Sequence, residues 1–321
     1  MRTSQSVIFV TVIAAAAAAA PGLAQAQQKF PTKPIRLVVG YPPGTQVDTT
    51  ARLIGQKISE SWGQAVVLDN RPGASGTLAA SMVAKAAPDG HTLLQTGVNF
   101  VASAAMQPGL PYDPVKDFAG IAHLGVGTQA LVVAPALGVN SVKDLIALAV
   151  VQPGKLIFGS SATGTGTHLG GARFNLATGI KVVHVAFKLG QEAMIETMTG
   201  RIHYSMVTLL AARPFIKDGK LLALAVTSPQ RLPILPEVPA LAESLPEFKR
   251  PEASSGLLAP AGTPRPILNQ ISKEVARILD LPDIKERLQF IGYVPSPSTP
   301  EEYDKILREQ IVHSKYAISG A

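Results

Sequence analysis

Short hydrophobic runs alternate with longer amphipathic segments along most of the chain. The short runs are rich in Val, Ile and Leu, which favours strands, and the longer segments repeat their hydrophobic residues at helical spacing. Loops that contain glycine and proline separate the two kinds of segment. This order of strand, loop and helix predicts an α/β fold with mostly parallel sheets. The expected strands are 35–39, 65–68, 92–96, 130–133, 156–159, 182–187, 202–208, 221–227 and 255–258, and the expected helices are 48–62, 78–87, 142–150, 168–178, 192–199, 264–279, 282–291 and 300–314.

The same order starts again near Gln129, which predicts two α/β units of similar size. Each unit has a glycine-bearing loop directly in front of a helix, at 42–49 in the first unit and at 160–168 in the second. The proline-rich segment 229–251 is expected to cover a surface, and 255–258 to cross between the units. Ligands favour the cleft between such units, so we expect both loops to meet there.

The first 26 residues are typical of a secretory signal peptide. Arg2 precedes an apolar run that begins near Val7, and a small-x-small ending lies before Gln27. The run is too short to span a bilayer stably, and a retained membrane anchor is the alternative interpretation. The chain has no cysteine, so a lipid-anchored lipoprotein is not expected. We therefore expect cleavage before Gln27 and a protein free in the periplasm of a Gram-negative cell.

Composition and charge exclude several classes of protein. Of the 321 residues, 46% are hydrophobic and only 16% are charged, which excludes an intrinsically disordered chain. The lack of cysteine removes disulfides, thiolate metal ligands and thiol nucleophiles. The formal net charge is +7, or +6 without Arg2, and a positive charge favours anionic ligands. Lys and Arg are scattered and aromatic residues make up 5%, so nucleic acid is not an expected partner.

The two loops offer backbone amides and hydroxyl groups. Asp48 is the expected N-cap of the helix after the first loop, and the second loop is rich in Ser, Thr and Gly. Unpaired amides at a helix N-terminus, together with the helix dipole, bind anions without Arg or Lys. Two such N-termini facing one cleft suit a carboxylate, although the same spacing also fits ordinary strand-to-helix turns.

The sequence contains no complete motif for binding a nucleotide or a metal ion. Gly159 and Gly164 have P-loop spacing, but Thr165 stands where Lys is required. Leu169 occupies the third glycine position of a dinucleotide fingerprint. The six histidines show no paired metal-ligand spacing, so neither a metal nor a cofactor is expected.

An exported hydrolase is the alternative from another class of protein. It would use Ser160 or Ser161 as the nucleophile and His168 as the base. No serine has the flanking glycines of a nucleophile elbow, and no acidic third partner can be assigned. We therefore expect no enzyme, and we expect His168 to order its loop by hydrogen bonding and His184 to be a core residue.

Ordered blocks of residues over nearly the whole chain after residue 26 resemble the Bug/TctC family of extracytoplasmic solute receptors. The blocks consist of Tyr41, Pro42, Pro43, Gly44, Asp48, Ala51 and Arg52; Asn70, Arg71, Pro72, Gly73 and Gly76; Ala84, Lys85, Ala86, Pro88, Asp89, Gly90 and Thr92; 110–114 and 116–118; Gly164, Thr165, His168 and Leu169; 223–228, Leu235, Pro236, Val238 and Pro239; and 259–264. The resemblance implies a type II periplasmic binding fold, in which two lobes close on an organic acid. The expected boundaries are a signal peptide at 1–26, lobe one at 27–127 and 254–321, and lobe two at 128–253.

The resemblance also implies how such a protein works. Backbone groups and ordered waters at the two loops hold the carboxylate of a small organic acid, which passes to the membrane subunits of a tripartite tricarboxylate transporter. The chain is expected to be a monomer that closes by hinge motion near 125–129 and 254–258. A sensory receptor that acts through a signalling partner is the alternative.

Departures from the family pattern bear on the ligand. Thr45 replaces a second glycine, and the segment 186–189, with Lys188, is less polar than the usual Pro-Tyr-Lys-Gly. His203 and Thr208 replace aspartates that relatives often carry, and the loss of carboxylates near the cleft disfavours a ligand with an ammonium group.

Phe100 is expected either to line the cleft beside Asn99 or to lie in the core. In the cleft it would favour a flat ligand, so we expect a carboxylate without an amino group, such as a benzoate or a phthalate isomer. The residues expected to contact the ligand are Tyr41, Pro43, Gly44, Thr45, Asp48, Asn99, Phe100, Ser160, Ser161, Thr163, Gly164, Thr165, Gly166, Thr167, His168, Lys188 and Thr208.

Overall fold

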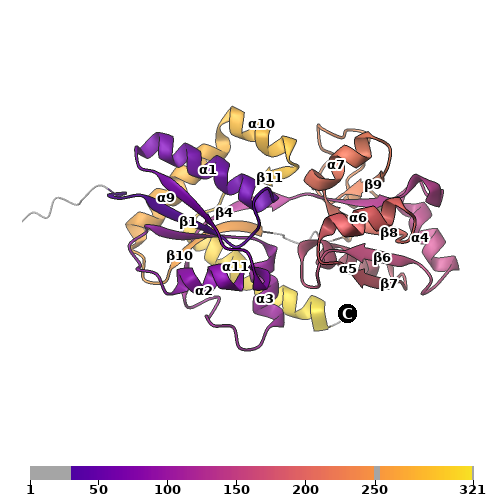
Figure 1. Ribbon diagram of the computed structural model, residues 1–321, viewed down its shortest axis with the longest axis horizontal. Coiled ribbons are helices and arrows are strands. Elements are labelled where there is room, and N and C mark those ends of the chain that lie inside the picture. Colours follow the sequence, from indigo (N-terminus) through magenta and orange to yellow (C-terminus); the bar gives the residue numbers. More distant parts are fainter. Residues whose placement is uncertain (1–29, 249–253, 320–321) are drawn as a thin grey trace, which may run out of the picture.

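The computed structural model describes residues 30–248 and 254–319, which form two lobes (Figure 1). The predicted signal peptide lies outside these residues. Within them, the first lobe has a sheet of six strands in the order β11-β4-β10-β3-β1-β2, and the second has a sheet of five in the order β7-β6-β8-β5-β9. Helices flank both sheets, so the α/β fold class predicted from the sequence is confirmed.

The first lobe combines segments from both ends of the chain. Its strands β1, β2 and β3 are parallel, and β10 runs antiparallel to β3 and β4, so the sheet is mixed. Its elements are β1 (Ile35–Val39), α1 (Gln46–Trp62), β2 (Val66–Asn70), α2 (Thr77–Ala84), β3 (Thr92–Thr96), α3 (Val98–Met106), β4 (Phe118–Gly127), β10 (Ser254–Pro260), α9 (Arg265–Asp280), α10 (Pro282–Phe290), β11 (Tyr293–Pro295) and α11 (Pro300–Ser319).

The second lobe is built from one continuous part of the chain. Its strand β6 is parallel to β7 and β8, whereas β5 is antiparallel to β8 and β9. Both sheets are therefore mixed, and the expectation of mostly parallel sheets is wrong. Its elements are β5 (Gln129–Val133), α4 (Val142–Val151), β6 (Ile157–Ser160), α5 (Gly166–Thr178), β7 (Val183–Ala186), α6 (Gly190–Met198), β8 (Tyr204–Thr208), α7 (Leu209–Lys217), β9 (Leu222–Val226) and α8 (Leu241–Ser244).

Hydrophobic residues of the central strands pack alternately against the two faces of each sheet. In β1, Leu37 and Val39 belong to a core with α1 and α9, whereas Val38 belongs to a core with α2, α3 and α11. In β5, Leu131 packs toward α4 and α5, and Val132 packs toward α6 and α7. Strands buried on both faces read as continuous apolar runs, which explains why they stand out in the sequence.

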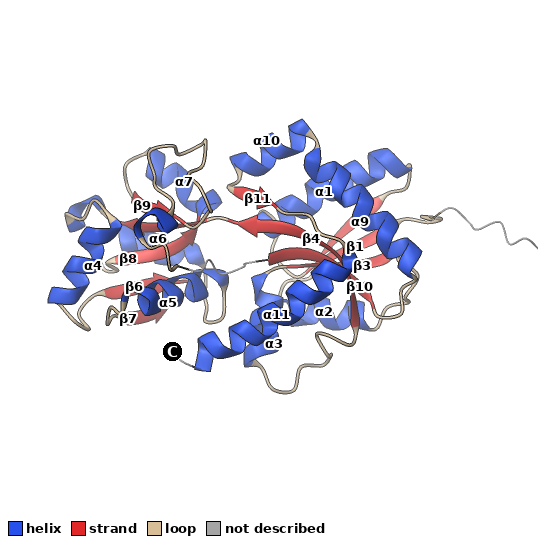
Figure 2. Cartoon of the chain, turned by 180° about the vertical axis from the view of Figure 1, so that it is seen from behind, coloured by secondary structure: helices blue, strands red, loops and turns tan. Residues whose placement is uncertain are grey.

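The chain passes directly from one sheet to the other at Thr128, between β4 and β5 (Figures 1 and 2). The backbone amide of Thr128 donates to the carbonyl of Gly292 at 2.8 Å, which holds this crossing against β11. The other connection includes residues 249–253, which lie outside the described residues. The lobe boundaries given above therefore stay a prediction.

Several elements differ from the sequence-based expectation. Helix α1 begins at Gln46 rather than residue 48, and α5 begins at Gly166 rather than residue 168. Strand β4 is longer than the expected crossing near 125–129, and α7 and β11 were not predicted. These differences matter because the early starts of α1 and α5 bring the unsatisfied amides of each helix N-terminus closer to the end of the preceding strand.

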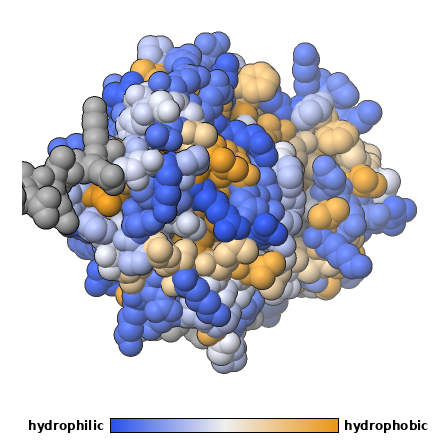
Figure 3. Space-filling model, turned by 60° about the vertical axis from the view of Figure 1, so that its left-hand side comes forward, coloured by the Kyte–Doolittle hydropathy of each residue, from blue (hydrophilic) through white to orange (hydrophobic). Residues whose placement is uncertain are grey.

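Polar and apolar side chains are mixed on the surface. On the face seen in Figure 3, hydrophobic residues lie in small groups between hydrophilic ones, as is usual for folded domains. Within residues 30–248 and 254–319, every helix is too short or too polar to cross a membrane.

Candidate ligand-binding site

A cavity of about 270 Å³ lies between the two lobes, and we call it the cleft cavity. Strand ends and helix starts of both lobes contribute to its wall. It is lined by Tyr41, Thr45, Gln46, Val47, Gly97, Val98, Asn99, Gly127, Thr128, Gln129, Ser161, Thr165, Gly166, Thr167, Thr208, Ser255 and Tyr293.

Four helices begin at the cleft cavity, two from each lobe. Their N-cap residues are Thr45 for α1, Gly97 for α3, Thr165 for α5 and Thr208 for α7, and all four line the cavity. Each cap lies at or after the last residue of a strand, β1, β3, β6 or β8. The carboxyl ends of strands in α/β sheets are the usual location of ligand sites, and helix N-termini there favour negative charge.

Backbone amides at two of these helix starts precede the first intrahelical hydrogen bond. That bond is donated by Thr49 to the carbonyl of Thr45 in α1, and by Leu169 to the carbonyl of Thr165 in α5, both at 2.9 Å. The amides of the residues between, such as Val47 and Thr167, therefore have no partner in the helix. They can donate to an anion in the cavity.

Hydroxyl groups of the second loop form a compact cluster beside these amides. The Oγ of Ser161 lies 2.7 Å from the Oγ1 of Thr165 and 2.5 Å from the Oγ1 of Thr167. Thr165 also caps α5, because its Oγ1 accepts from the amide of His168 at 3.5 Å. The cluster offers several hydroxyl donors that can rotate toward an acceptor.

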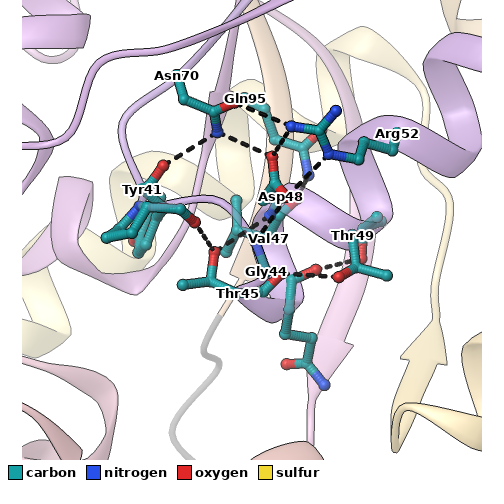
Figure 4. A network of polar contacts seen from close by, with 12 residues as sticks. Tyr41, Gly44, Thr45, Val47, Asp48, Thr49, Arg52, Asn70 and Gln95 are labelled. Atoms are coloured by element: carbon teal, nitrogen blue, oxygen red, sulfur yellow. Dashed lines mark hydrogen bonds and ion pairs between the residues drawn. The ribbon is translucent and has the colours of Figure 1, made fainter.

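The first loop is held by the buried carboxylate of Asp48 (Figure 4), which is not part of the wall of the cleft cavity. Its carboxylate accepts from the amide of Gly44 at 2.8 Å, from Asn70 Nδ2 at 2.8 Å and from Arg52 Nε at 3.0 Å. Burial raises the pKa of this carboxyl, but these donors outweigh burial and hold the pKa below its usual value. The expectation that Asp48 is the N-cap is wrong: Thr45 caps α1 and accepts from the amide of Asp48 at 3.4 Å.

Tyr41 ties the first loop to the start of α3. Its hydroxyl oxygen accepts from the amide of Asn99 at 3.1 Å, and its carbonyl accepts from Asn70 Nδ2 at 3.1 Å. Gly97 is required here, because a Cβ at this position would lie 2.4 Å from the Tyr41 hydroxyl. Burial raises the pKa of Tyr41, so the hydroxyl stays protonated.

Gln129 is the main cavity residue that sequence reasoning missed. Its side chain is 5% exposed, and its Oε1 has no hydrogen-bond partner among the described residues. A Cβ on Gly170 would lie 2.2 Å from that oxygen, and a Cβ on Gly166 would lie 3.1 Å from the Nε2. The Gln129 amide thus lies against the first turn of α5, a long-range contact that spacing along the chain does not reveal.

The wall of the cleft cavity, as far as the structure describes it, contains no Asp, Glu, Lys, Arg or His side chain. Other residues that sequence reasoning missed on it are also neutral: Gln46, Val47, Gly97, Val98, Gly127, Thr128, Ser255 and Tyr293. A charged ligand would therefore be stabilised by backbone dipoles, hydroxyls and amides. Such groups favour an anion at the helix N-termini and offer no carboxylate to an ammonium group.

The structure brings together eight of the seventeen predicted contact residues on this wall: Tyr41, Thr45, Asn99, Ser161, Thr165, Gly166, Thr167 and Thr208. Phe100 is not among them, because it is 6% exposed and packs in the core, with its ring 5.7 Å from that of Tyr112. Lys188 is exposed after β7, where its amide donates to Glu192 at 3.0 Å. Pro43, Gly44 and Thr163 are exposed in the loops.

Gly164, Ser160 and His168 also lie off the cavity wall. Gly164 contacts α3, since a Cβ there would lie 3.0 Å from the sulfur of Met106. Ser160 is fully buried; its Oγ donates to the carbonyl of Ser161 at 2.7 Å and lies 2.8 Å from His184 Nε2. His168 instead accepts from the amide of Gly164 at 3.2 Å. The Ser and His groups of the alternative hydrolase thus hold the loop together, and Ser160 is not accessible as a nucleophile.

Two lobes around a neutral cavity that is rich in helix N-termini define a receptor of the periplasmic binding protein class. Comparison with known proteins gives the family: the family model described as "Tripartite tricarboxylate transporter family receptor" matches residues 50–320. The chain belongs to this family, and the resemblance to the Bug/TctC receptors is confirmed. In the described residues, no group of three or more His, Cys, Asp or Glu side chains is placed to hold a metal ion.

Similar proteins extend over most of the chain. The "UPF0065 protein in tcbD-tcbE intergenic region" of Pseudomonas sp. strain P51 is 35% identical over 280 residues, which cover 87% of this chain and 83% of the relative. A solved structure described as "R. palustris Rpa4515 with adipate" is 32% identical, has a TM-score of 0.79 and covers 90% of this chain and 97% of its own. Another, MatC (Rpa3494) from Rhodopseudomonas palustris with bound malate, is 29% identical, has a TM-score of 0.75 and covers 90% of this chain and 100% of its own.

Proposed function

We propose that this protein is a periplasmic receptor that captures an organic dicarboxylate without an ammonium group in the cleft cavity. It delivers this ligand as a monomer to the membrane subunits of a tripartite tricarboxylate transporter. The observation that carries the proposal is the meeting of four helix N-caps, two from each lobe, at a cavity whose described wall has no charged side chain. Each lobe can hold one carboxylate by its amides and hydroxyls.

Size and relatives support a small diacid. A cavity of about 270 Å³ is at the small end of ligand sites, which suits a small organic acid. The similar Rhodopseudomonas proteins have adipate and malate bound, and both are dicarboxylates. The expectation of an aromatic acid rested on Phe100, and it loses that support because Phe100 lies in the core. Phthalate isomers therefore enter the test beside aliphatic diacids.

The first test is ligand binding by the purified protein after removal of co-purified ligand. We expect adipate, malate or a phthalate isomer to raise the melting temperature, because a ligand at about 100 times its Kd adds about 2.7 kcal/mol. Benzoate, with one carboxylate, should bind more weakly than the matching diacid, and glutamate should bind weakest. Tight binding of glutamate together with no binding of any diacid that lacks an ammonium group would overturn the proposal.

A variant links this binding to the cleft cavity. Thr165→Ala removes the cap of α5 and one hydroxyl of the wall, and we expect the diacid to bind about tenfold more weakly, since a hydrogen bond to a charged group contributes about 1.5–3 kcal/mol. Thr178→Ala is the matched control at the far end of the same helix, where the hydroxyl donates to the Phe174 carbonyl at 2.8 Å. Equal affinities of the two variants, measured by titration calorimetry, would place the ligand elsewhere.

A further inference from the structure

A second and larger cavity lies within the second lobe, away from the cleft. Its volume is about 630 Å³, and its lining comes from α5, from β6 and β7, and from the chain just before β7. In Figures 1 and 2, α5 lies beside β6 and the edge strand β7. We call it the α5–β7 cavity. It shares no lining residue with the cleft cavity. It is lined by Gly154, Phe158, His168, Leu169, Ala172, Arg173, Asn175, Leu176, Gly179, Ile180, Lys181, Val182 and His184.

One wall of the α5–β7 cavity is part of a continuous aromatic stack. The ring of His168 lies 4.5 Å from that of His184, which lies 5.0 Å from Phe158. Phe158 in turn stacks at 5.3 Å on Tyr204, and the interplanar angles along the stack are 25–30°. Burial lowers the pKa of both histidines, so the two facing rings are neutral at neutral pH. His184 and Phe158 are each covered on both faces by their neighbours, so the stack offers uncharged ring edges, which suit an edge-to-face contact with an aromatic ring.

The rest of the wall is mostly apolar, apart from Asn175 and two positively charged residues. Leu169, Ile180 and Val182 contribute aliphatic side chains. Arg173 and Lys181 are the charged residues of the lining, and no acidic side chain is among the residues described there. Lys181 is exposed and forms no ion pair with a described carboxylate.

The shape of the cavity follows from two features of α5. The helix packs tightly on the sheet at Gly171, where a Cβ would lie 1.8 Å from the ring of Phe158. It then ends at Gly179, whose φ of +68° turns the chain back toward the edge strand β7. The helix therefore leaves the edge of the sheet uncovered, and Leu176, which is 69% exposed, lies at the rim.

We propose that the α5–β7 cavity is a second ligand site, which takes an amphipathic monocarboxylate with an aryl body. The aryl group packs against the ring edges of the stack and the aliphatic wall, and the carboxylate lies at the mouth near Lys181. This chemistry differs from that of the cleft cavity, which is small, hydroxyl-rich and uncharged. The inference uses other residues than the proposed function and holds or fails independently of it.

The test is a titration of the purified protein with 4-phenylbutyrate and with the uncharged 4-phenyl-1-butanol, which has the same hydrocarbon skeleton. We expect saturable binding of one 4-phenylbutyrate in this cavity and at least about fivefold weaker binding of the alcohol, because the alcohol lacks the charge that the basic mouth attracts. Binding that is unsaturable, or equal for acid and alcohol, would overturn the proposal.

Two variants locate the bound acid. Ala172→Phe fills the cavity and should abolish 4-phenylbutyrate binding. Leu176→Glu keeps the packing, because this side chain is exposed, and it should weaken the acid about fivefold or more by placing a carboxylate at the mouth. Val150→Glu is the matched control, since Val150 is 63% exposed on α4 outside the lining. Parent-like affinity of Leu176→Glu, even if Ala172→Phe fails to fold, would overturn the site.

Discussion

At the scale of single residues, Asp48 shows how a buried charge supports a neutral cavity without lining it. Its carboxylate is 2% exposed and accepts from Gly44, Arg52 and Asn70 (Figure 4). These bonds fix the turn that leads into α1, and so they place the free amides at the start of that helix. The charge of Asp48 is compensated by Arg52 on the solvent side, which keeps the cleft wall free of charge.

Asp48→Asn is expected to destabilise the protein by about 1–3 kcal/mol at neutral pH, because the new amide group faces donors that need an acceptor. The pKa of Asp48 is lower in the folded than in the unfolded chain, so the stabilisation by its charge is present above the unfolded pKa, near 3.8. It is lost as the pH falls through the folded value. Urea unfolding of parent and variant should therefore converge as the pH falls below about 4.

The matched control is Asp280→Asn. Asp280 also forms an ion pair, with Lys285 at 2.5 Å, but its side chain is 80% exposed, so it should unfold like the parent at each pH. A difference between Asp48→Asn and the parent that stays constant down to about pH 2 would show that the charge of Asp48 contributes no stability.

At the scale of elements, α5 combines a binding end with a packing requirement. Its N-terminus lines the cleft cavity, and Gly170 and Gly171 lie in its middle, where glycine lowers helix stability. The structure explains both glycines: a Cβ on Gly170 would meet Gln129, and a Cβ on Gly171 would meet Phe158. The glycines thus bring the helix start close to β5 and β6, and the cost in helix propensity is offset by close packing.

Gly171→Ala should therefore destabilise the protein, although alanine is the better helix former. We expect a loss of about 1–3 kcal/mol in urea unfolding, as is typical of overpacked cores. Gly190→Ala is the control, because this glycine lies in the first turn of α6 with only Ser161 Cβ, at 3.9 Å, near the new Cβ. It should be neutral or slightly stabilising. A Gly171→Ala variant as stable as Gly190→Ala would contradict the packing argument.

At the scale of the whole molecule, the sequence predicts what depends on neighbouring residues. The apolar run at β1 and the amphipathic segment at α1 are local signals, and so is the glycine-rich loop before α5. Strand β4 was largely missed because it contains Gly120 and Gly125, residues that are rare in strands. Residues far away in the sequence explain why glycine is needed at these two positions. Gly120 lies against Asp304, and Gly125 has a φ of +143° and lies against the carbonyl of Val294.

Part of the candidate site could likewise be predicted from neighbouring residues in the sequence, and part could not. Thr45 and Thr165 could be predicted because each stands in a loop directly before a helix. Gln129 could not, since its role depends on α5 lying across β5 in the folded lobe. Phe100 was ambiguous, because the first turn of a helix can face a cleft or a core, and only the rings of Tyr112 and Phe118 around it decide between them.

The two lobes also contact each other outside the cleft cavity. The guanidinium carbon of Arg213, on α7, lies 4.2 Å from the ring centroid of Phe290, at the end of α10. Its Nη1 donates to the Phe290 carbonyl at 3.1 Å. On another side, the loop at Gly164 contacts Met106 of α3. Ligand binding between the lobes requires them to stay together, so such contacts contribute to affinity without touching the ligand.

Arg213→Ala should weaken binding of the dicarboxylate about two- to fivefold, because a cation–π contact at an exposed site contributes about 0.5–1 kcal/mol and helps to keep the lobes together. Arg287→Ala, which removes an exposed arginine of α10 outside this contact, is the control and should bind like the parent. Small-angle scattering separates the cause: without ligand, Arg213→Ala should have a larger radius of gyration than the parent, and both proteins should reach the same smaller value at saturating ligand. An affinity loss with a parent-like radius of gyration in the ligand-free state would assign Arg213 to the ligand rather than to the joining of the lobes.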